Sequence, residues 1–231
     1  MDFFTFLDSA AVLAPWFRKP CLLGARSPDL EDSALFPAAQ SLGRQAEEAM
    51  LTATGGVNTH QGLIFSLGLL CTASGQLHPR RLPSGEEGPL ETADLCRRAA
   101  ALGCGSGLLH ACSWRANARH LAWGNPGRGT PCLSSVRRWV LPVLQQAESP
   151  EEGGCQALLA LIAHVEDANI LRRGGHSALE AAAQRAKQVL NAPTKAFQEE
   201  LTAFDQELIR AELSPGGCAG LLAVGYFLSC K

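Results

Sequence analysis

"TGGVNTHQGLIFSLGLL", residues 54–70, joins a polar, glycine-rich segment to an unbroken apolar run. The apolar run is hydrophobic on all sides of a helix, which predicts a helix buried in a protein core. One capping side chain is enough to begin a helix, yet five residues with polar or flexible character precede this one: Gly55, Gly56, Asn58, Thr59 and His60. The stretch therefore predicts a core helix whose N-terminal end also has a functional role.

The rest of the chain predicts the same fold class. Alternating runs of β-branched residues, which are typical of strands, are absent from the sequence. Helices are expected at Phe3–Phe17, Ala34–Thr52, Thr59–Ser74, Glu91–Leu102, Leu108–Leu121, Ser134–Gln146, Gly154–Arg172, Ser177–Leu190, Thr194–Ala211 and Pro215–Ser229. We therefore expect an all-α protein, folded as a single globular multi-helix domain over residues 1–231.

Composition and charge exclude several classes of function. A net charge near −2 argues against a general binder of nucleic acid or acidic membranes. Nine cysteines without a C-x-x-C pair predict free thiols of a reducing compartment and argue against a zinc site. The apolar N-terminus lacks the basic segment of a signal peptide, and no later run is long enough to span a bilayer unbroken. We therefore expect a soluble cytoplasmic protein with no nucleic-acid or membrane partner.

Arginines are concentrated in residues 95–147, where the sequence has no Asp or Glu. One interpretation is that each arginine lies on a solvated helix face and pairs with an acid from elsewhere. The alternative is a shared positive surface for phosphates, because guanidinium groups match phosphate oxygens. The arginines concerned are Arg97, Arg98, Arg115, Arg119, Arg128, Arg137 and Arg138.

The glycine pair of the opening stretch recurs twice. Gly174 and Gly175 precede a predicted helix whose Ser177 and Glu180 form a capping box. The third occurrence adds a predicted N-cap, a proline at the first helical position and two glycines: Ser214, Pro215, Gly216 and Gly217.

Three helix starts of this kind suggest one binding site. The N-terminus of a helix exposes unpaired N–H groups, and glycine lets a ligand approach the backbone closely. We expect the starts of the Thr59, Ser177 and Pro215 helices to converge on one pocket for a polyanion such as a triphosphate. The alternative is that each glycine pair is only a tight turn.

Polar side chains near these helix starts suggest more specific chemistry. Asp167, Asn169 and Arg173 lie close together in the sequence and could hold a hydrated cation and a phosphate oxygen. His60 is either a helix-capping residue or a general base.

Three segments carry a resemblance to a known family: "ATGGVNTHQGLIFSLGLL" (53–70), "EDANILRRGG" (166–175) and "LSPGGCAGLLA" (213–223). In this order and spacing they resemble the triphosphoribosyl-dephospho-CoA synthase family along essentially the whole chain. The resemblance implies an all-α enzyme that transfers the 5-triphosphoribosyl group of ATP to the 2′-hydroxyl of 3′-dephospho-CoA and releases adenine. The product is the prosthetic-group precursor of citrate lyase or malonate decarboxylase, which makes a downstream prosthetic-group transferase a candidate partner.

The resemblance also implies roles for individual residues. Catalytic roles fall on His60, Asp167 and Asp2, and Mg²⁺ accompanying ATP would be held by Asp167 and Asn169. Nucleotide binding is implied for Gly55, Gly56, Asn58, Thr59, Asn169, Arg173, Gly174, Gly175, Arg128, Ser214, Gly216 and Gly217.

The chain departs from the family pattern at four places. Gln61 stands where the family has Lys, and residues 218–220 read Cys-Ala-Gly instead of Ser-Ala-Asp. Residues 126–135, "PGRGTPCLSS", lack the glutamates of an acidic family loop, and the family's N-terminal segment is expected to be missing. These changes leave two alternatives open: a lapsed homologue that binds nucleotide without turnover, and a purely structural helical protein.

Overall fold

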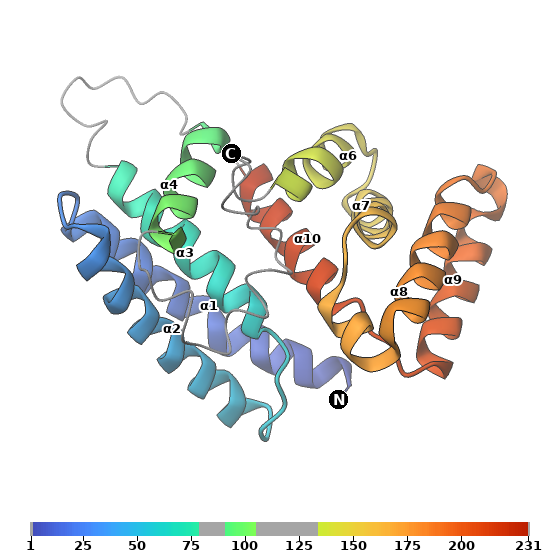
Figure 1. The fold of residues 1–231 in the computed structure, drawn as a ribbon, viewed down its shortest axis with the longest axis horizontal. Coiled ribbons are helices and arrows are strands. Elements are labelled where there is room, and N and C mark those ends of the chain that lie inside the picture. Colours follow the sequence, from blue (N-terminus) through green and yellow to red (C-terminus); the bar gives the residue numbers. More distant parts are fainter. Residues whose placement is uncertain (1, 79–90, 105–133, 231) are drawn as a thin grey trace. The chain divides into compact units, whose positions relative to one another are not determined.

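The computed structural model describes residues 2–78, 91–104 and 134–230 (Figure 1). These residues form nine α-helices, one short π-helix and no strand, which confirms the predicted all-α class. Within the described residues no helix combines the length and the apolar character needed to cross a membrane. The helix expected at Leu108–Leu121 lies outside the described residues.

The chain divides into two compact units by its internal contacts. The described residues 2–78 and 91–104 belong to the N-terminal unit, and residues 134–230 belong to the C-terminal unit. Each unit is described by itself below. The expectation that residues 1–231 fold as a single domain stays a prediction.

The N-terminal unit is built around one apolar helix, α3 (Gln61–Leu77). It packs against α1 (Phe3–Arg26), α2 (Asp32–Ala53) and α4 (Thr92–Cys104). Its buried side chains lie on several faces and include Ile64, Phe65, Leu69, Leu70 and Cys71. The prediction of a core helix behind the polar stretch is therefore confirmed.

Helix α1 extends further than the sequence suggested. We expected it to end at Phe17 and a loop to follow, but it continues through Pro15 and Pro20 to Arg26. The physical reason is a close crossing with α3. A Cβ on Gly24 would collide with the Thr72 carbonyl, and a Cβ on Gly75 would collide with the Cys21 carbonyl. Two glycines thus allow the two helix backbones to touch, and this packing keeps the last turns of α1 helical.

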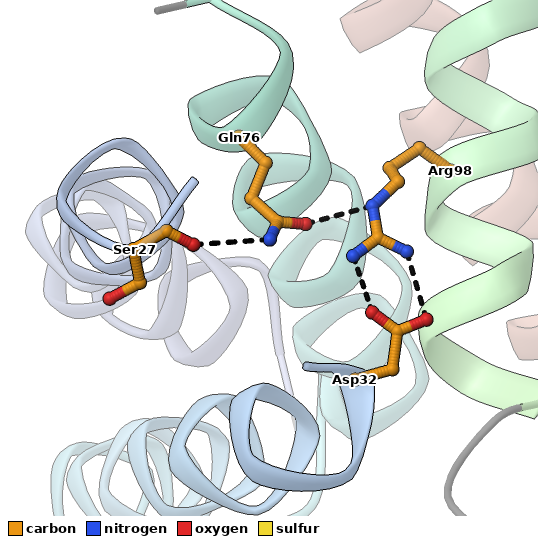
Figure 2. A network of polar contacts seen from close by, with 4 residues as sticks. All are labelled: Ser27, Asp32, Gln76 and Arg98. Carbon is orange, nitrogen blue, oxygen red and sulfur yellow. Dashed lines mark hydrogen bonds and ion pairs between the residues drawn. The ribbon is translucent and has the colours of Figure 1, made fainter. Parts of the chain in front are cut away.

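A buried polar network joins α4 to the other helices of the N-terminal unit (Figure 2). The Arg98 guanidinium donates two hydrogen bonds to the Asp32 carboxylate and a third, 2.8 Å long, to Gln76 Oε1. The Gln76 amide in turn donates to the Ser27 carbonyl at 3.2 Å. Gln76 is almost fully buried, so its polar atoms depend on these partners.

Two of the arginines between residues 95 and 147 pair with acids and do not belong to a free positive surface. Arg98 pairs with Asp32, and Arg97 pairs with Asp94 one turn away on the same helix. Both therefore follow the interpretation of arginines paired with acids. Arg137 and Arg138 are exposed, and the Arg138 guanidinium lies 4.8 Å from the Trp139 ring centre. Three other arginines lie outside the described residues: Arg115, Arg119 and Arg128.

The C-terminal unit is formed by the remaining elements: η3 (Val136–Val140), α6 (Leu141–Gln146), α7 (Pro150–His164), α8 (Ala168–Leu190), α9 (Thr194–Arg210) and α10 (Gly216–Ser229). The apolar helices α7 and α10 pack against each other, and both also contact α6, η3 and α8. Helix α9 packs on α8, where Arg185 pairs with Glu200 and Glu207. The core of this unit therefore lies between α7, α8 and α10.

Two predicted boundaries in this unit were wrong. Helix α7 begins at Pro150 and ends at His164, instead of spanning Gly154–Arg172. Its start has ordinary signals, because the Ser149 hydroxyl accepts the Glu152 N–H at 3.1 Å and a proline follows at the first helical position. The chain then breaks before Asp167, which caps the next helix.

The close crossing of α1 and α3 gives a stability prediction. Gly75→Ala places a methyl group against the α1 backbone, and we expect it to lower the free energy of unfolding by about 1–3 kcal/mol. The matched control is Gly68→Ala in the same helix, where a Cβ meets no atom within 4 Å. That change should raise stability by up to about 1 kcal/mol, because alanine favours helices more than glycine does.

Urea unfolding followed by circular dichroism measures both changes. A Gly75→Ala variant as stable as the wild type would show that the two backbones do not touch. A destabilised Gly68→Ala variant would show that the effect is not specific to the crossing.

Candidate functional site

The first glycine pair ends one helix and does not begin the next. Gly55 and Gly56 have φ angles of +63° and +89°, and the Gly56 N–H donates to the Leu51 carbonyl at 2.7 Å. This is the left-handed turn that closes α2, and glycine adopts it without steric cost. Helix α3 begins later, at Gln61, whose N–H donates to Asn58 Oδ1 at 3.2 Å. His60 is the N-cap residue of α3, but its side chain makes no capping hydrogen bond, and Asn58 supplies the side-chain acceptor instead.

The side chain of His60 is held by two hydroxyl groups. Its Nδ1 lies 2.7 Å from Ser9 Oγ and 3.1 Å from Thr59 Oγ1, and the two hydroxyl oxygens are 2.6 Å apart. Phe6 packs edge-on against the imidazole with ring centres 5.6 Å apart. The His60 backbone N–H donates to Met50 Sδ at 3.3 Å. Helix α1 and the segment between α2 and α3 thus fix the side chain of His60, and α2 holds its backbone.

Burial lowers the pKa of His60, so the imidazole is neutral at neutral pH. Ser9 is completely buried and was missed by the sequence analysis. It lies inside an apolar helix, where a serine is ordinarily structural, and nothing in the local pattern distinguishes it. Only the fold shows that it contacts a residue fifty positions away.

Asp2 has a capping role in the structure. It begins α1, where its Oδ1 accepts the Thr5 N–H at 2.9 Å and the Thr5 hydroxyl at 2.8 Å. The hydrogen bond from the Thr5 backbone lowers the pKa of Asp2, which keeps this exposed carboxylate charged. The catalytic role of Asp2 stays a prediction.

Asp167 is the central residue of the C-terminal unit. It is 2% exposed, and it begins α8. Its Oδ1 accepts the backbone N–H groups of Asn169 and Ile170 at 2.8 and 3.1 Å. Its Oδ2 accepts the Cys218 N–H, in the first turn of α10, at 2.7 Å. One carboxylate therefore caps the N-termini of two helices, which also places its charge at the positive end of both helix dipoles.

The third glycine pair accommodates protein side chains. A Cβ on Gly217 would lie 3.0 Å from Asp167 Oδ2, and a Cβ on Gly216 would lie 2.5 Å from the Asn169 amide nitrogen. We had expected these glycines to make room for a ligand. The space beside them is instead filled by the Asp167 and Asn169 side chains, so the two motifs pack directly against each other.

The predicted start of α10 is corrected in the same way. The helix begins at Gly216 and its N-cap is Pro215, one residue after the predicted Ser214. Proline has no side-chain acceptor for a helix N–H, and Asp167 supplies one from another element.

The second glycine pair produces a kink. The stretch from Ala168 to Leu190, α8, consists of two helical segments that meet at a kink, and the second segment follows Gly175, close to the predicted start at Ser177. Gly175 interrupts it with a φ of +72° and a ψ of −171°. The Arg173 Nη1 donates to the Glu212 carbonyl at 3.0 Å, and Gly174 lies against Leu213. The kinked segment therefore contacts the residues that lead into α10.

The structure thus brings together the predicted residues of the C-terminal unit, from Asp167 to Gly175 and from Ser214 to Gly217. Asn58, Thr59 and His60 lie in the N-terminal unit. The prediction that all three glycine pairs line one pocket stays a prediction, and Arg128 lies outside the described residues. A Cβ at Gly55, Gly56 or Gly175 would meet no atom within 4 Å.

No group of three or more His, Cys, Asp or Glu side chains in the described part of the chain is arranged to hold a metal ion. In the described residues, the metal site predicted at Asp167 and Asn169 is therefore not completed by a cluster of further ligands.

Comparison with known proteins identifies the family. The family described as ATP:dephospho-CoA triphosphoribosyl transferase matches residues 1–121 and 127–230. The chain belongs to this family. It is 36% identical to a probable 2-(5''-triphosphoribosyl)-3'-dephosphocoenzyme-A synthase of Albidiferax ferrireducens, over 99% of this chain and 79% of that protein. No solved structure matches the chain.

Other members give the same result. The chain is 36% identical to the 2-(5''-triphosphoribosyl)-3'-dephosphocoenzyme-A synthase of Pectobacterium atrosepticum, over 99% of this chain and 77% of that protein. It is 35% identical to the enzyme of the same name from Klebsiella pneumoniae, over 99% and 79%. The resemblance and the transferase class predicted from the motifs are confirmed, and the lapsed-homologue alternative gains no support from these comparisons.

The double cap gives a prediction for Asp167. In Asp167→Asn the amide keeps one acceptor oxygen and turns an NH₂ group toward the other backbone donors. We expect this to lower the free energy of unfolding by about 1–3 kcal/mol, because at least one buried N–H loses its acceptor. Glu166→Gln, an amide substitution at the exposed neighbouring position, should change stability by less than about 0.5 kcal/mol. Urea unfolding of both variants measures these changes. An Asp167→Asn variant as stable as the wild type would show that Asp167 does not act as a cap.

Proposed function

We propose that the protein transfers the 5-triphosphoribosyl group of ATP to the 2′-hydroxyl of 3′-dephospho-CoA and releases adenine. The C1′–N9 bond of ATP breaks, and a bond between the 2′-oxygen and C1′ forms. The electron pair of the broken bond leaves with adenine, which takes up one proton, and the 2′-hydroxyl loses one, so the protons balance through the solvent. The triphosphate stays intact, and no oxidant or reductant is needed.

The observation that carries this proposal is the family match along nearly the whole chain. It is supported by where the shared motifs lie in the fold. Asn58 and Asp167 each cap a helix, and His60 lies directly before the first turn of α3. Residues of two of the shared motifs thus lie at helix starts, where their side chains are held in fixed positions.

Displacement at C1′ passes through a state with positive charge on the ribose and growing negative charge on the leaving base. A carboxylate near the ribose and a hydrogen-bond donor near the base both stabilise it. We assign the donor role to the neutral His60. Asp2, exposed and charged at the start of α1, is our candidate for the carboxylate.

For the triphosphate we propose backbone contacts at the two glycines of the N-terminal unit that have open space beside them, Gly55 and Gly56. Asn58 and Thr59 lie next to this pair in the sequence. In the C-terminal unit, Gly175 also has open space beside it, and the exposed Arg173 adds positive charge there.

The described residues do not fit a resident magnesium site. Asp167 is buried, and both of its oxygens already accept backbone N–H groups. Mg²⁺ commonly binds through substrate phosphates and retained waters with few protein ligands. We therefore propose that Mg²⁺ enters with ATP and is held mainly by the triphosphate.

We also propose that the enzyme works in the cytoplasm, where ATP is abundant and thiols stay reduced. The six cysteines in the described residues form no disulfide, and three of them are buried: Cys71, Cys96 and Cys218. Burial raises the pKa of Cys71 to about 12, which keeps this thiol neutral and unreactive. We propose a prosthetic-group transferase, which would consume the product, as the partner of this enzyme.

Product analysis tests the proposed reaction. We expect the chain, incubated with Mg-ATP and 3′-dephospho-CoA, to release adenine in equal amount to a triphosphoribosylated product, both measured by chromatography and mass spectrometry. His60→Ala should lower kcat by at least about a hundredfold, the usual loss when a hydrogen-bond donor to charge that develops in the transition state is removed. Binding of ATP without adenine release by the wild-type chain would favour the lapsed homologue.

A second measurement concerns magnesium and Asp167. If Asp167 acts as a cap, Asp167→Asn changes the affinity for ATP by the same factor with and without Mg²⁺. Isothermal titration calorimetry of the full chain at a temperature where the variant is folded gives both affinities. A loss confined to the magnesium complex would instead make Asp167 a metal ligand, as the sequence analysis predicted.

A further inference from the structure

We infer that Ser9 positions His60 as the tautomer that carries its proton on Nε2, so that His60 donates a hydrogen bond to the leaving adenine and does not act as a general base. The inference rests on the proposed function for the identity of the acceptor. Its structural part, the contact of Ser9 with His60, stands on the geometry alone.

Two hydroxyl groups and one ring nitrogen share the hydrogen-bonding protons beside His60. Ser9 Oγ, Thr59 Oγ1 and His60 Nδ1 lie within 3.1 Å of one another. If Nδ1 carries no proton, the Ser9 hydroxyl donates to Nδ1 and the Thr59 hydroxyl donates to Ser9 Oγ. Both hydroxyl protons are then used inside the group, and the one donor that points out of it is the Nε2–H of His60.

The other tautomer leaves a donor without a partner in this group. If Nδ1–H donates to Ser9 Oγ, the Ser9 hydroxyl must donate to Thr59 Oγ1, and the Thr59 proton needs an acceptor elsewhere. No further acceptor for Thr59 is found among the described residues. Ser9 is completely buried, so its hydroxyl must use Nδ1 or Thr59, whereas the partly exposed Thr59 can donate to water. The tautomers therefore differ in which donor faces outward, and the Ser9–Nδ1 distance of 2.7 Å decides between them, because it is shorter than the about 2.9–3.0 Å usual for an N–H donor and favours a Ser9 hydroxyl that donates to Nδ1.

The surroundings of the ring fit the same assignment. Ser9 and Phe6 contact it from α1, Met50 contacts its backbone from α2, and Thr59 precedes it. In the part of the chain that the structure describes, no charged side chain hydrogen-bonds or pairs with the imidazole. Burial alone lowers the pKa of His60, so the neutral form is the one whose tautomer matters.

Nε2 has no hydrogen-bond partner among the described residues, and its N–H is free to meet a substrate. A neutral imidazole is too weak an acid to lose this proton, but it stabilises growing negative charge by hydrogen bonding. As the C1′–N9 bond breaks, that charge develops on the ring nitrogens of adenine. The hydrogen bond strengthens in the transition state, and the proton stays on His60.

Nuclear magnetic resonance tests the positioning directly. Long-range ¹H–¹⁵N correlation spectra distinguish the two imidazole tautomers and the charged form, and His60→Gln identifies the His60 signals by their loss. We expect wild-type His60 to be neutral with the proton on Nε2. Ser9→Ala should shift and broaden these signals, whereas Ser41→Ala, at an exposed position on α2, should leave them unchanged. A proton on Nδ1 in the wild type would overturn the inference.

Kinetics test the consequence for the reaction. Ser9→Ala should lower kcat about fivefold to tenfold, the effect of one lost neutral hydrogen bond, with KM for ATP nearly unchanged. Thr59→Val removes the second hydroxyl at constant shape and should have a smaller effect of the same kind, which Thr59→Ser restores. An unchanged kcat in Ser9→Ala would show that Ser9 is only structural.

Two substitutions of His60 separate a donor from a base. The glutamine amide in His60→Gln can reach the position of Nε2 and donate a hydrogen bond, but it cannot accept a proton as a base. We expect His60→Gln to keep a kcat at least about tenfold above that of His60→Ala. Equal activity of the two variants would overturn the donor role.

Failure of the proposed function is distinguishable from failure of this inference. Absence of adenine release from the wild-type chain would overturn the proposed reaction and with it the role of adenine as acceptor. The spectrum of His60 and its response to Ser9→Ala need no substrate, and they decide the positioning in either case.

Discussion

The structure of the C-terminal unit depends on one buried carboxylate. Asp167 accepts N–H groups from the first turns of α8 and α10, and both helices would otherwise begin with unpaired donors in a dry environment. This requirement explains why the two motifs occur together. The glycines of residues 216–217 are small because Asn169 and Asp167 pack against them, and the acid is placed where the second helix needs an acceptor.

In the N-terminal unit, uncharged side chains supply the acceptor at the helix start. Asn58 caps α3, while Ser9 and Thr59 hold His60 beside it. In both units most polar atoms of the motifs are thus occupied by the protein itself. Among the described residues of the N-terminal motif, the backbone beside Gly55 and Gly56 has open space, and no hydrogen bond to Nε2 of His60 is found; in the C-terminal unit the backbone beside Gly175 is open. Side chains that the protein itself holds in place need little reorganisation when a substrate binds.

The sequence was sufficient for the fold class and for the helices whose signals are local. Helix α9 was expected at Thr194–Ala211 and spans Thr194–Arg210, because its amphipathic period and preceding proline lie within the segment itself. Helix α1 was cut short because the packing that carries it past Pro20 comes from Gly75, far along the chain. The cap of α10 was misassigned for the same reason, since its acceptor lies on another element.

For the candidate site, too, local features were predictable from the sequence and distant partners were not. Residue types at the motifs were visible in the sequence, and they did mark helix boundaries. The partners were not visible, because Ser9 has no local feature that connects it to His60, and because a glycine pair looks the same whether it ends, kinks or begins a helix. Backbone φ angles at Gly56 and Gly175, and the crowded Cβ positions at Gly216 and Gly217, separate these three cases.

Two departures from the family pattern leave the capping contacts at the helix starts intact. Gln61, where the family has Lys, still reaches Glu47 and also accepts a hydrogen bond from Asn58 at 2.7 Å. Cys218 contributes its backbone N–H to Asp167, which any residue except proline would supply. Its buried side chain stays a neutral thiol, because burial and the charge of Asp167 raise its pKa. Since the capping contacts survive both changes, these substitutions are compatible with a folded, working site, and they do not by themselves argue for a chain that has lost its reaction.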